Sequence, residues 1–190
     1  MIIILLILST VSFGQQIRLK KNIQIDTLRV CISFSNEIEL EMKKSLDSIF
    51  NLAIADFNSS SSSFIILYDS VNKKNMIKMH MGNIKYVTTK SSVLLTGIDL
   101  VLIAGHVFMI GTYGWTLPIW PFLLPATHSK VELSIDPNIV KSKYETRMWI
   151  NPNGYFMKKP KQKDKFKKKF FKKITKFFNT INNQNIKNNK

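Results

Sequence analysis

The sequence is short of cysteine, glycine and acidic residues. It holds one cysteine, seven glycines, and twelve aspartates and glutamates against twenty-eight lysines and arginines. A single cysteine, Cys31, excludes an intramolecular disulfide. Because apolar residues alternate around it, we predict a small, buried or half-buried side chain there rather than a nucleophile.

The usual signatures of catalysis are also missing. The glycines form neither GxGxxG nor GxxxxGKS, so the common phosphate-binding loops are excluded. His80, His106 and His128 have no partner four residues away and no cysteine pair, which argues against zinc. No serine occupies a nucleophile-elbow pattern. We therefore predict a non-enzymatic protein with no catalytic residue, cofactor or metal.

One long stretch lacks charge. Residues 91–129 contain no Lys, Arg or Glu, and Asp99 is their only carboxylate. A bilayer is crossed by about 20 apolar residues. In residues 93–111, eleven Val, Leu, Ile and Phe contribute about −3 to −7 kcal/mol to insertion. Asp99 opposes this by at most about 3.5 kcal/mol. We predict a membrane helix; the alternative is a helical hairpin buried in a soluble core.

The end of this stretch differs from its beginning. Pro118, Pro121 and Pro125 disturb any helix there, and residues 115–125 are too few for a second span. Trp115 and Trp120 suit the headgroup layer as interfacial anchors. We expect an interfacial or re-entrant segment; the alternative is an apolar loop packed on the soluble domain.

Polar residues in the predicted helix recur at every seventh position: Ser92, Asp99, His106 and Tyr113. On a helix they form one stripe that drifts by about 20° per heptad. Polar groups in a membrane usually face protein or water. The stripe therefore favours a packing face for a protein partner or a second copy of the chain, with satisfaction inside the same chain as the alternative. A membrane-embedded enzyme or proton carrier using Asp99 and His106 ranks last.

Residues 1–14 resemble a secretory signal peptide, although no Lys or Arg precedes the apolar core. Ser12 and Gly14 place small residues before a cleavage site at Gln15. The alternative is a buried N-terminal strand. Cys31 lies well past this segment, so it is not the lipidated cysteine of a lipoprotein. We expect an exported, membrane-associated protein of the cell envelope.

The body predicts an α+β fold, a strand–helix–strand start followed by hairpins. Residues 28–34 alternate with period two, and residues 38–57 carry a one-sided apolar pattern. The short apolar run of residues 64–68 predicts a buried strand. Asn36 and Glu39 resemble a capping box. Residues 76–81 alternate, with Ile77, Met79 and Met81 on one face and Lys78 and His80 on the other, and with residues 84–89 they resemble a hairpin around Gly82-Asn83. Further strands are expected at 131–135 and 144–150. The resulting regions are 1–14, 15–90, 91–129, 130–157 and 158–190.

The C-terminal region carries most of the net charge of +16, because residues 158–190 hold thirteen lysines and one aspartate. Residues 163–182 have helical spacing, with lysines on one face and aromatic residues on the other. This pattern favours a helix in a membrane interface that binds anionic lipid. A helix docked on the body is the alternative, and the lack of arginine argues against reading nucleic acid. We predict anionic-surface binding by Lys165, Lys167, Lys168, Lys169, Lys172, Lys173 and Lys176, and interfacial anchoring by Phe166, Phe170, Ile174 and Phe178. The final NNQNIKNNK is expected to be disordered.

Two functions follow from these patterns. The first is a membrane-attached envelope protein whose α+β domain is an interaction or assembly module. The second is a soluble secreted protein whose apolar run is core and whose basic tail binds an anionic polymer.

Overall fold

The computed structural model describes residues 19–20, 25–60, 62–69, 76–113, 126–140, 145–152 and 157–188. The predicted signal peptide, Trp115 and Trp120 lie outside this part of the chain. The chain divides into two compact units. The first contains Met1–Asn83, Lys130–Trp149 and Phe171–Lys190, and the second contains Ile84–Ser129 and Ile150–Phe170. The fold is mixed α+β, as the sequence predicts.

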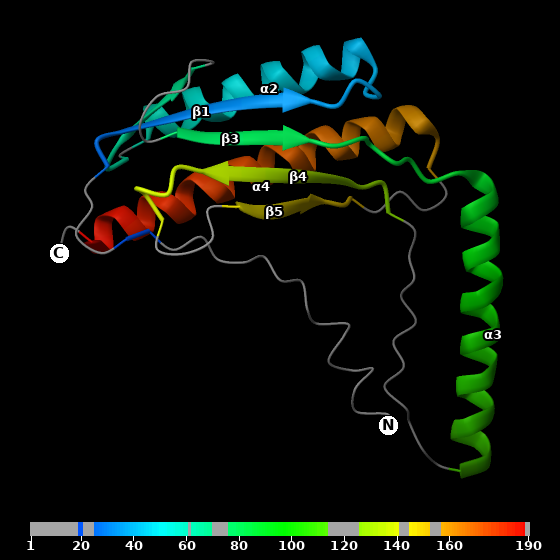
Figure 1. Cartoon of the computed structure of the whole chain (residues 1–190). Coiled ribbons are helices and arrows are strands. Elements are labelled where there is room, and N and C mark those ends of the chain that lie inside the picture. Colours follow the sequence, from blue (N-terminus) through cyan, green and yellow to red (C-terminus); the bar gives the residue numbers. More distant parts are fainter. Residues whose placement is uncertain are drawn as a thin grey trace. The chain divides into compact units, whose positions relative to one another are not determined.

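A five-stranded sheet in the order β2-β1-β3-β4-β5 organises the first unit (Figure 1). Its strands are β1 (Thr27–Phe34), β2 (Ile65–Tyr68), β3 (Met76–Met81), β4 (Ser129–Ile135) and β5 (Glu145–Ile150). Strand β1 pairs in parallel with β2 on one side and with β3 on the other. Strand β3 pairs antiparallel with β4, from Ile77↔Ile135 to Met81↔Val131. The strands before and after the apolar insert are therefore direct partners.

The strand–helix–strand start is confirmed. Helix α2 (Leu40–Ser59) follows β1 and buries Met42, Leu46, Phe50, Ala53, Ile54 and Phe57. The predicted capping box is wrong. The helix begins one turn later than Asn36, Glu39 occupies the N-cap, and no side chain caps it. Instead the Ser35 hydroxyl accepts a hydrogen bond from the Glu37 N–H.

Two strand predictions need correction. Strand β2 is the edge of the sheet, and only Ile66 of its four residues is buried. The predicted hairpin between residues 76–81 and 84–89 does not form, because β3 pairs with β1 and β4. The predicted alternation is nevertheless right, since Met79 and Met81 are buried while Lys78 and His80 are exposed.

Helix α4 (Lys159–Asn188) is longer than predicted and contributes to both units. Its part in the first unit packs Phe178 against Phe50 and Phe57 of α2, with ring centroids 6.1 and 5.9 Å apart. The final polar run is helical to Asn188 rather than disordered. The buried Asn185 amide accepts from the Ile25 N–H and donates to the Ile25 carbonyl, each at 3.1 Å. These bonds join the last turns of α4 to the start of β1.

Candidate functional site

Helix α3 (Thr89–Tyr113) occupies the apolar insert, within the second unit. Its 25 residues correspond to roughly 37 Å of helix. Seven of its large apolar side chains are between 40% and 72% exposed: Val93, Leu94, Ile98, Leu100, Val101, Val107 and Phe108. No described atom lies within 4 Å of a Cβ built on Gly97, Gly105 or Gly111. The buried-core alternative does not predict this exposure.

Among the residues that the structure describes, no helix has both the length and the apolar character that crossing a membrane requires.

The two ends of the insert meet at one point. Lys85 and His128 form an antiparallel bridge in which each N–H donates to the other's carbonyl, at 2.9 and 3.0 Å. Residues 86–127 therefore leave and rejoin the body at the same bridge. Together with the β3–β4 pairing, this closes the insert at its base.

A buried glutamine holds this base together. Gln162, in the first turn of α4, is 1% exposed. Its carbonyl oxygen accepts from the Val87 N–H at 2.9 Å and from the Thr127 hydroxyl. Its amide nitrogen donates to the carbonyls of Val87 and Met157, at 2.9 and 2.7 Å. One side chain thus joins the entry of the insert, its exit and the start of α4.

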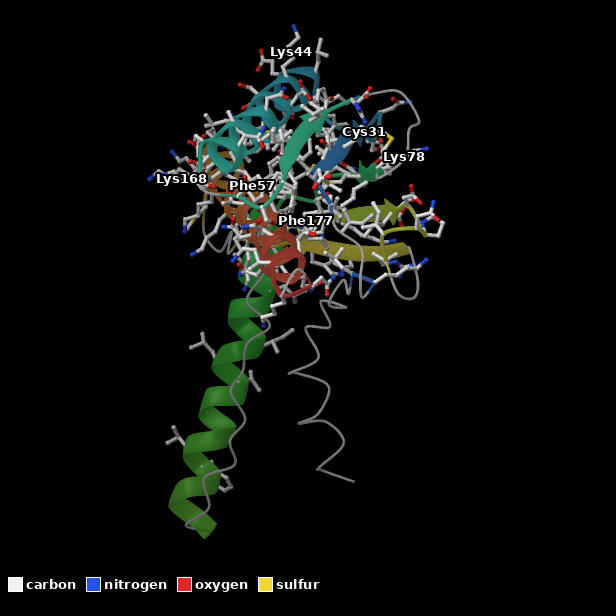
Figure 2. The ribbon with its side chains drawn as sticks, turned by 90° about the vertical axis from the view of Figure 1, so that its left-hand side faces the viewer. Cys31, Lys44, Phe57, Lys78, Lys168 and Phe177 are labelled. Carbon is white, nitrogen blue, oxygen red and sulfur yellow. The ribbon has the colours of Figure 1, made fainter. Side chains whose placement is uncertain are left out.

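Lysines line the outer side of α4. Four of the seven predicted surface-binding lysines are exposed, Lys165, Lys168, Lys172 and Lys176, and Lys161 extends the same row. Their spacing of three and four residues places them on one stripe, about 22 Å long. Lys167, Lys169 and Lys173 are half-buried along its margins. Figure 2 shows Lys168 pointing outward from the helix.

The aromatic side of α4 corrects the sequence analysis. Phe166, Phe170, Ile174 and Phe178, the predicted interfacial anchors, are all 0% exposed. In this structure they are core residues that no membrane surface reaches. The alternative of a docked helix describes this face. Because both kinds of helix show the same spacing of apolar residues, periodicity alone does not separate them.

The sheet carries a second cluster of polar side chains, opposite the helices. Cys31 and Lys78 project from the side of the sheet away from Phe57 (Figure 2). Ser33 Oγ and His80 Nδ1 form a hydrogen bond of 3.0 Å, and Glu132 lies beside His80 on β4. Hydroxyl, imidazole and carboxylate thus share three neighbouring strands. The surface is exposed, however, and covalent catalysis relies on water-excluded donors for the developing charge.

The pKa shifts on this face also do not favour a reactive nucleophile. Burial raises the pKa of the Cys31 thiol, and the nearby Lys78 ammonium only partly offsets this. A raised pKa lowers the fraction of reactive thiolate. A hydrogen bond and the charge of Lys130 lower the pKa of Glu132, which therefore stays ionised as the partner of that lysine. Across the described residues, no group of three or more His, Cys, Asp or Glu side chains is arranged to hold a metal ion.

Comparison with known proteins adds no relative. No family model, no curated protein and no solved structure matches this chain.

The predicted polar stripe lies entirely on α3. Ser92, Asp99, His106 and Tyr113 fall within the helical residues, so the backbone carries them on the spacing that the sequence predicts. Their side chains are outside what the structure describes, and the packing role of the stripe stays a prediction. Trp115 and Trp120 likewise stay predictions.

Sequence reasoning overlooked the two buried amides. Gln162 and Asn185 lie four residues before Phe166 and four residues after Ile181, on the continuation of the apolar stripe of α4. A polar residue at a core position of a helix needs a protein partner, because an unpaired buried amide is unfavourable. Their positions on the stripe were the available signal for a docked helix.

Proposed function

We propose that this protein is a non-enzymatic, membrane-attached component of the cell envelope. The observation that carries the proposal is the exposure of the apolar side chains of α3. Contiguous apolar surface of this extent usually marks contact with a membrane or a partner. The apolar insert attaches the chain, and the α+β body serves as an interaction or assembly module. Export by residues 1–14 is part of the same proposal.

The closed base of the insert supports a hairpin rather than a single crossing. Strands β3 and β4 pair across it, and Lys85 pairs with His128. A single crossing would place these partners on opposite sides of the membrane and break the sheet.

Alkaline carbonate extraction of membranes from expressing cells tests the attachment. We expect the wild-type chain to remain in the membrane pellet. Replacing Val101 and Val107 of α3 by aspartate should release it, because two central aspartates oppose insertion by about 5–7 kcal/mol. That amount is comparable to the whole apolar contribution of residues 93–111.

The matched control introduces two aspartates at exposed positions of another helix, α2. Leu40 and Leu52 of α2 are 67% and 59% exposed, so their replacement by aspartate introduces equal charge on the body. This variant should remain in the pellet. Release of the wild type, or of both variants equally, would overturn attachment through α3.

The lysine stripe of α4 favours a second candidate, a secreted protein that binds an anionic polymer through this face. Five exposed lysines on one stripe suit a chain of phosphates or carboxylates. A purely electrostatic complex dissociates at high salt, whereas apolar attachment persists. Retention in the pellet in high salt, lost in the Val101→Asp and Val107→Asp variant, would separate the first candidate from the second.

A further inference from the structure

The base of α3 gathers positive charge, of which the candidate functions so far use only Lys161. Five lysines belong to it, and we call them the lysine collar: Lys85, Lys90, Lys158, Lys159 and Lys161. All five are exposed. The whole second unit contains only two acidic residues, Asp99 and Asp164. The second unit is therefore strongly basic in composition.

Hydrogen bonds bring the collar together from separate parts of the chain. The Gln162 amide binds Val87, two residues after Lys85 and three before Lys90. Lys158, Lys159 and Lys161 lie within four residues of the same glutamine. The Lys159 ammonium also lies 5.2 Å from the centre of the Tyr86 ring. The two sets of lysines thus lie close in sequence to residues that meet just before α3 begins, Val87 with Gln162 and Tyr86 with Lys159.

The placement of these lysines on α4 is electrostatically unusual. The first turn of a helix favours negative charge, because its free N–H groups carry a partial positive charge. The first turn of α4 has no acidic residue and two lysines, Lys159 and Lys161. An anion bound there would be favoured by the lysines and by the helix end together. The apolar helix α3 begins two residues after Val87, which is bonded to Gln162 in this first turn. A ligand that suits both features has an anionic surface and an apolar interior.

We infer that the lysine collar binds the phosphate groups of anionic phospholipids where α3 enters the membrane. The inference rests on the proposed membrane attachment and adds the partner's headgroup chemistry. α3 provides attachment to any bilayer, while the collar makes the chain prefer an anionic one. Each lysine near an anionic surface contributes roughly fivefold in affinity.

Vesicle flotation of the full-length chain tests this. One vesicle set is phosphatidylcholine, and the other is phosphatidylcholine mixed with phosphatidylglycerol. We expect the wild type to float with both and to bind the anionic set at least about tenfold more tightly. Replacing the five collar lysines by glutamine should abolish the preference and leave binding to phosphatidylcholine intact. Replacing them by arginine should preserve the preference, which shows that charge rather than folding is responsible.

A distal variant controls for total charge. Lys168, Lys169, Lys172, Lys173 and Lys176 begin seven residues beyond Lys161, about 10 Å along α4. Their replacement by glutamine removes the same charge and should retain most of the preference. An equal loss in both glutamine variants would overturn the collar as the binding place. Equal wild-type affinity for the two vesicle sets would overturn the inference while leaving attachment intact.

Failure of the proposed function has a different signature. Wild-type chain that floats with neither vesicle set would overturn the attachment and the collar together. If that same chain bound single-stranded DNA or polyphosphate in a salt-sensitive way, the anionic-polymer candidate would replace both.

Discussion

At the scale of single residues, two buried side-chain amides, Gln162 and Asn185, connect segments of the chain by hydrogen bonds. The Gln162 side chain accepts hydrogen bonds from Val87 and Thr127 and donates two more to Val87 and Met157. Asn185 accepts one hydrogen bond from the Ile25 N–H and donates two, to the Ile25 carbonyl and the Ser63 hydroxyl. Each joins backbone segments far apart in the sequence. The two amides thereby tie both ends of α4 to other segments of the chain.

Replacing Gln162 by leucine tests this role. The change keeps the volume similar but leaves the Val87 N–H and carbonyl, the Thr127 hydroxyl and the Met157 carbonyl without this partner. We expect the free energy of unfolding to fall by at least about 1–3 kcal/mol, the usual range for a buried group left unsatisfied. Urea unfolding of the detergent-solubilised chain, followed by circular dichroism, measures it. Lys168→Leu, on the exposed side of α4, should change stability by about 0.5 kcal/mol or less. Equal losses of stability in the two variants would contradict this role of Gln162.

At the scale of elements, local sequence patterns predicted whether a segment is a helix or a strand better than they predicted its packing partners. The alternation in β1 and the one-sided apolar pattern of α2 identify both elements, because burial on one face imposes those periods. The partners of β3 were missed, since its pairing with β1 and β4 is set by distant residues. The Gly82-Asn83 turn favoured a local hairpin that the sheet does not use. β2 was expected to be buried, yet its position at the sheet edge leaves Ile65 and Leu67 exposed.

At the candidate site, the two faces of α4 also show that a local pattern identifies an element but not what it contacts. The lysine stripe was predicted from charge alone, and four of its seven residues are exposed as expected. The fate of the apolar stripe was not predictable from periodicity, because lipid and protein core select the same residues. Only the amides at its two ends distinguish them. The base of the insert was equally hidden, since residues 85 and 128 are forty-three positions apart.

The docked arrangement of α4 predicts the effect of truncating its buried face. Replacing Phe170 by alanine removes a side chain that is 0% exposed. We expect a loss of about 3–5 kcal/mol in the free energy of unfolding, as for other large-to-small core changes. Thermal or urea unfolding measures it, with the exposed Lys172→Ala as the neighbouring control. If Phe170→Ala kept full stability and weakened only vesicle binding, the aromatic face would be a membrane anchor after all.

At the scale of the whole molecule, the sheet constrains how the chain meets a membrane. The insert leaves after β3 and returns before β4, and these strands are hydrogen-bonded along five residue pairs. Separating them across a bilayer would expose the unpaired backbone of both, and short isolated strands are not stable. Under the proposed attachment, β3, β4 and the rest of their sheet therefore stay on one side of the membrane.

Cysteine labelling tests this topology directly. In a Cys31→Ser background, single cysteines replace Asn83 before the insert and Ser134 after it, both exposed positions. A membrane-impermeant maleimide is then applied to intact spheroplasts. The hairpin arrangement predicts that both cysteines react to the same extent, and export predicts that both are accessible. Reaction of one and protection of the other would establish a single crossing and refute the paired β3–β4 sheet in the membrane-bound chain. Protection of both until the membrane is permeabilised would keep the hairpin but place the body on the cytoplasmic side, so that residues 1–14 would no longer be interpreted as an export signal.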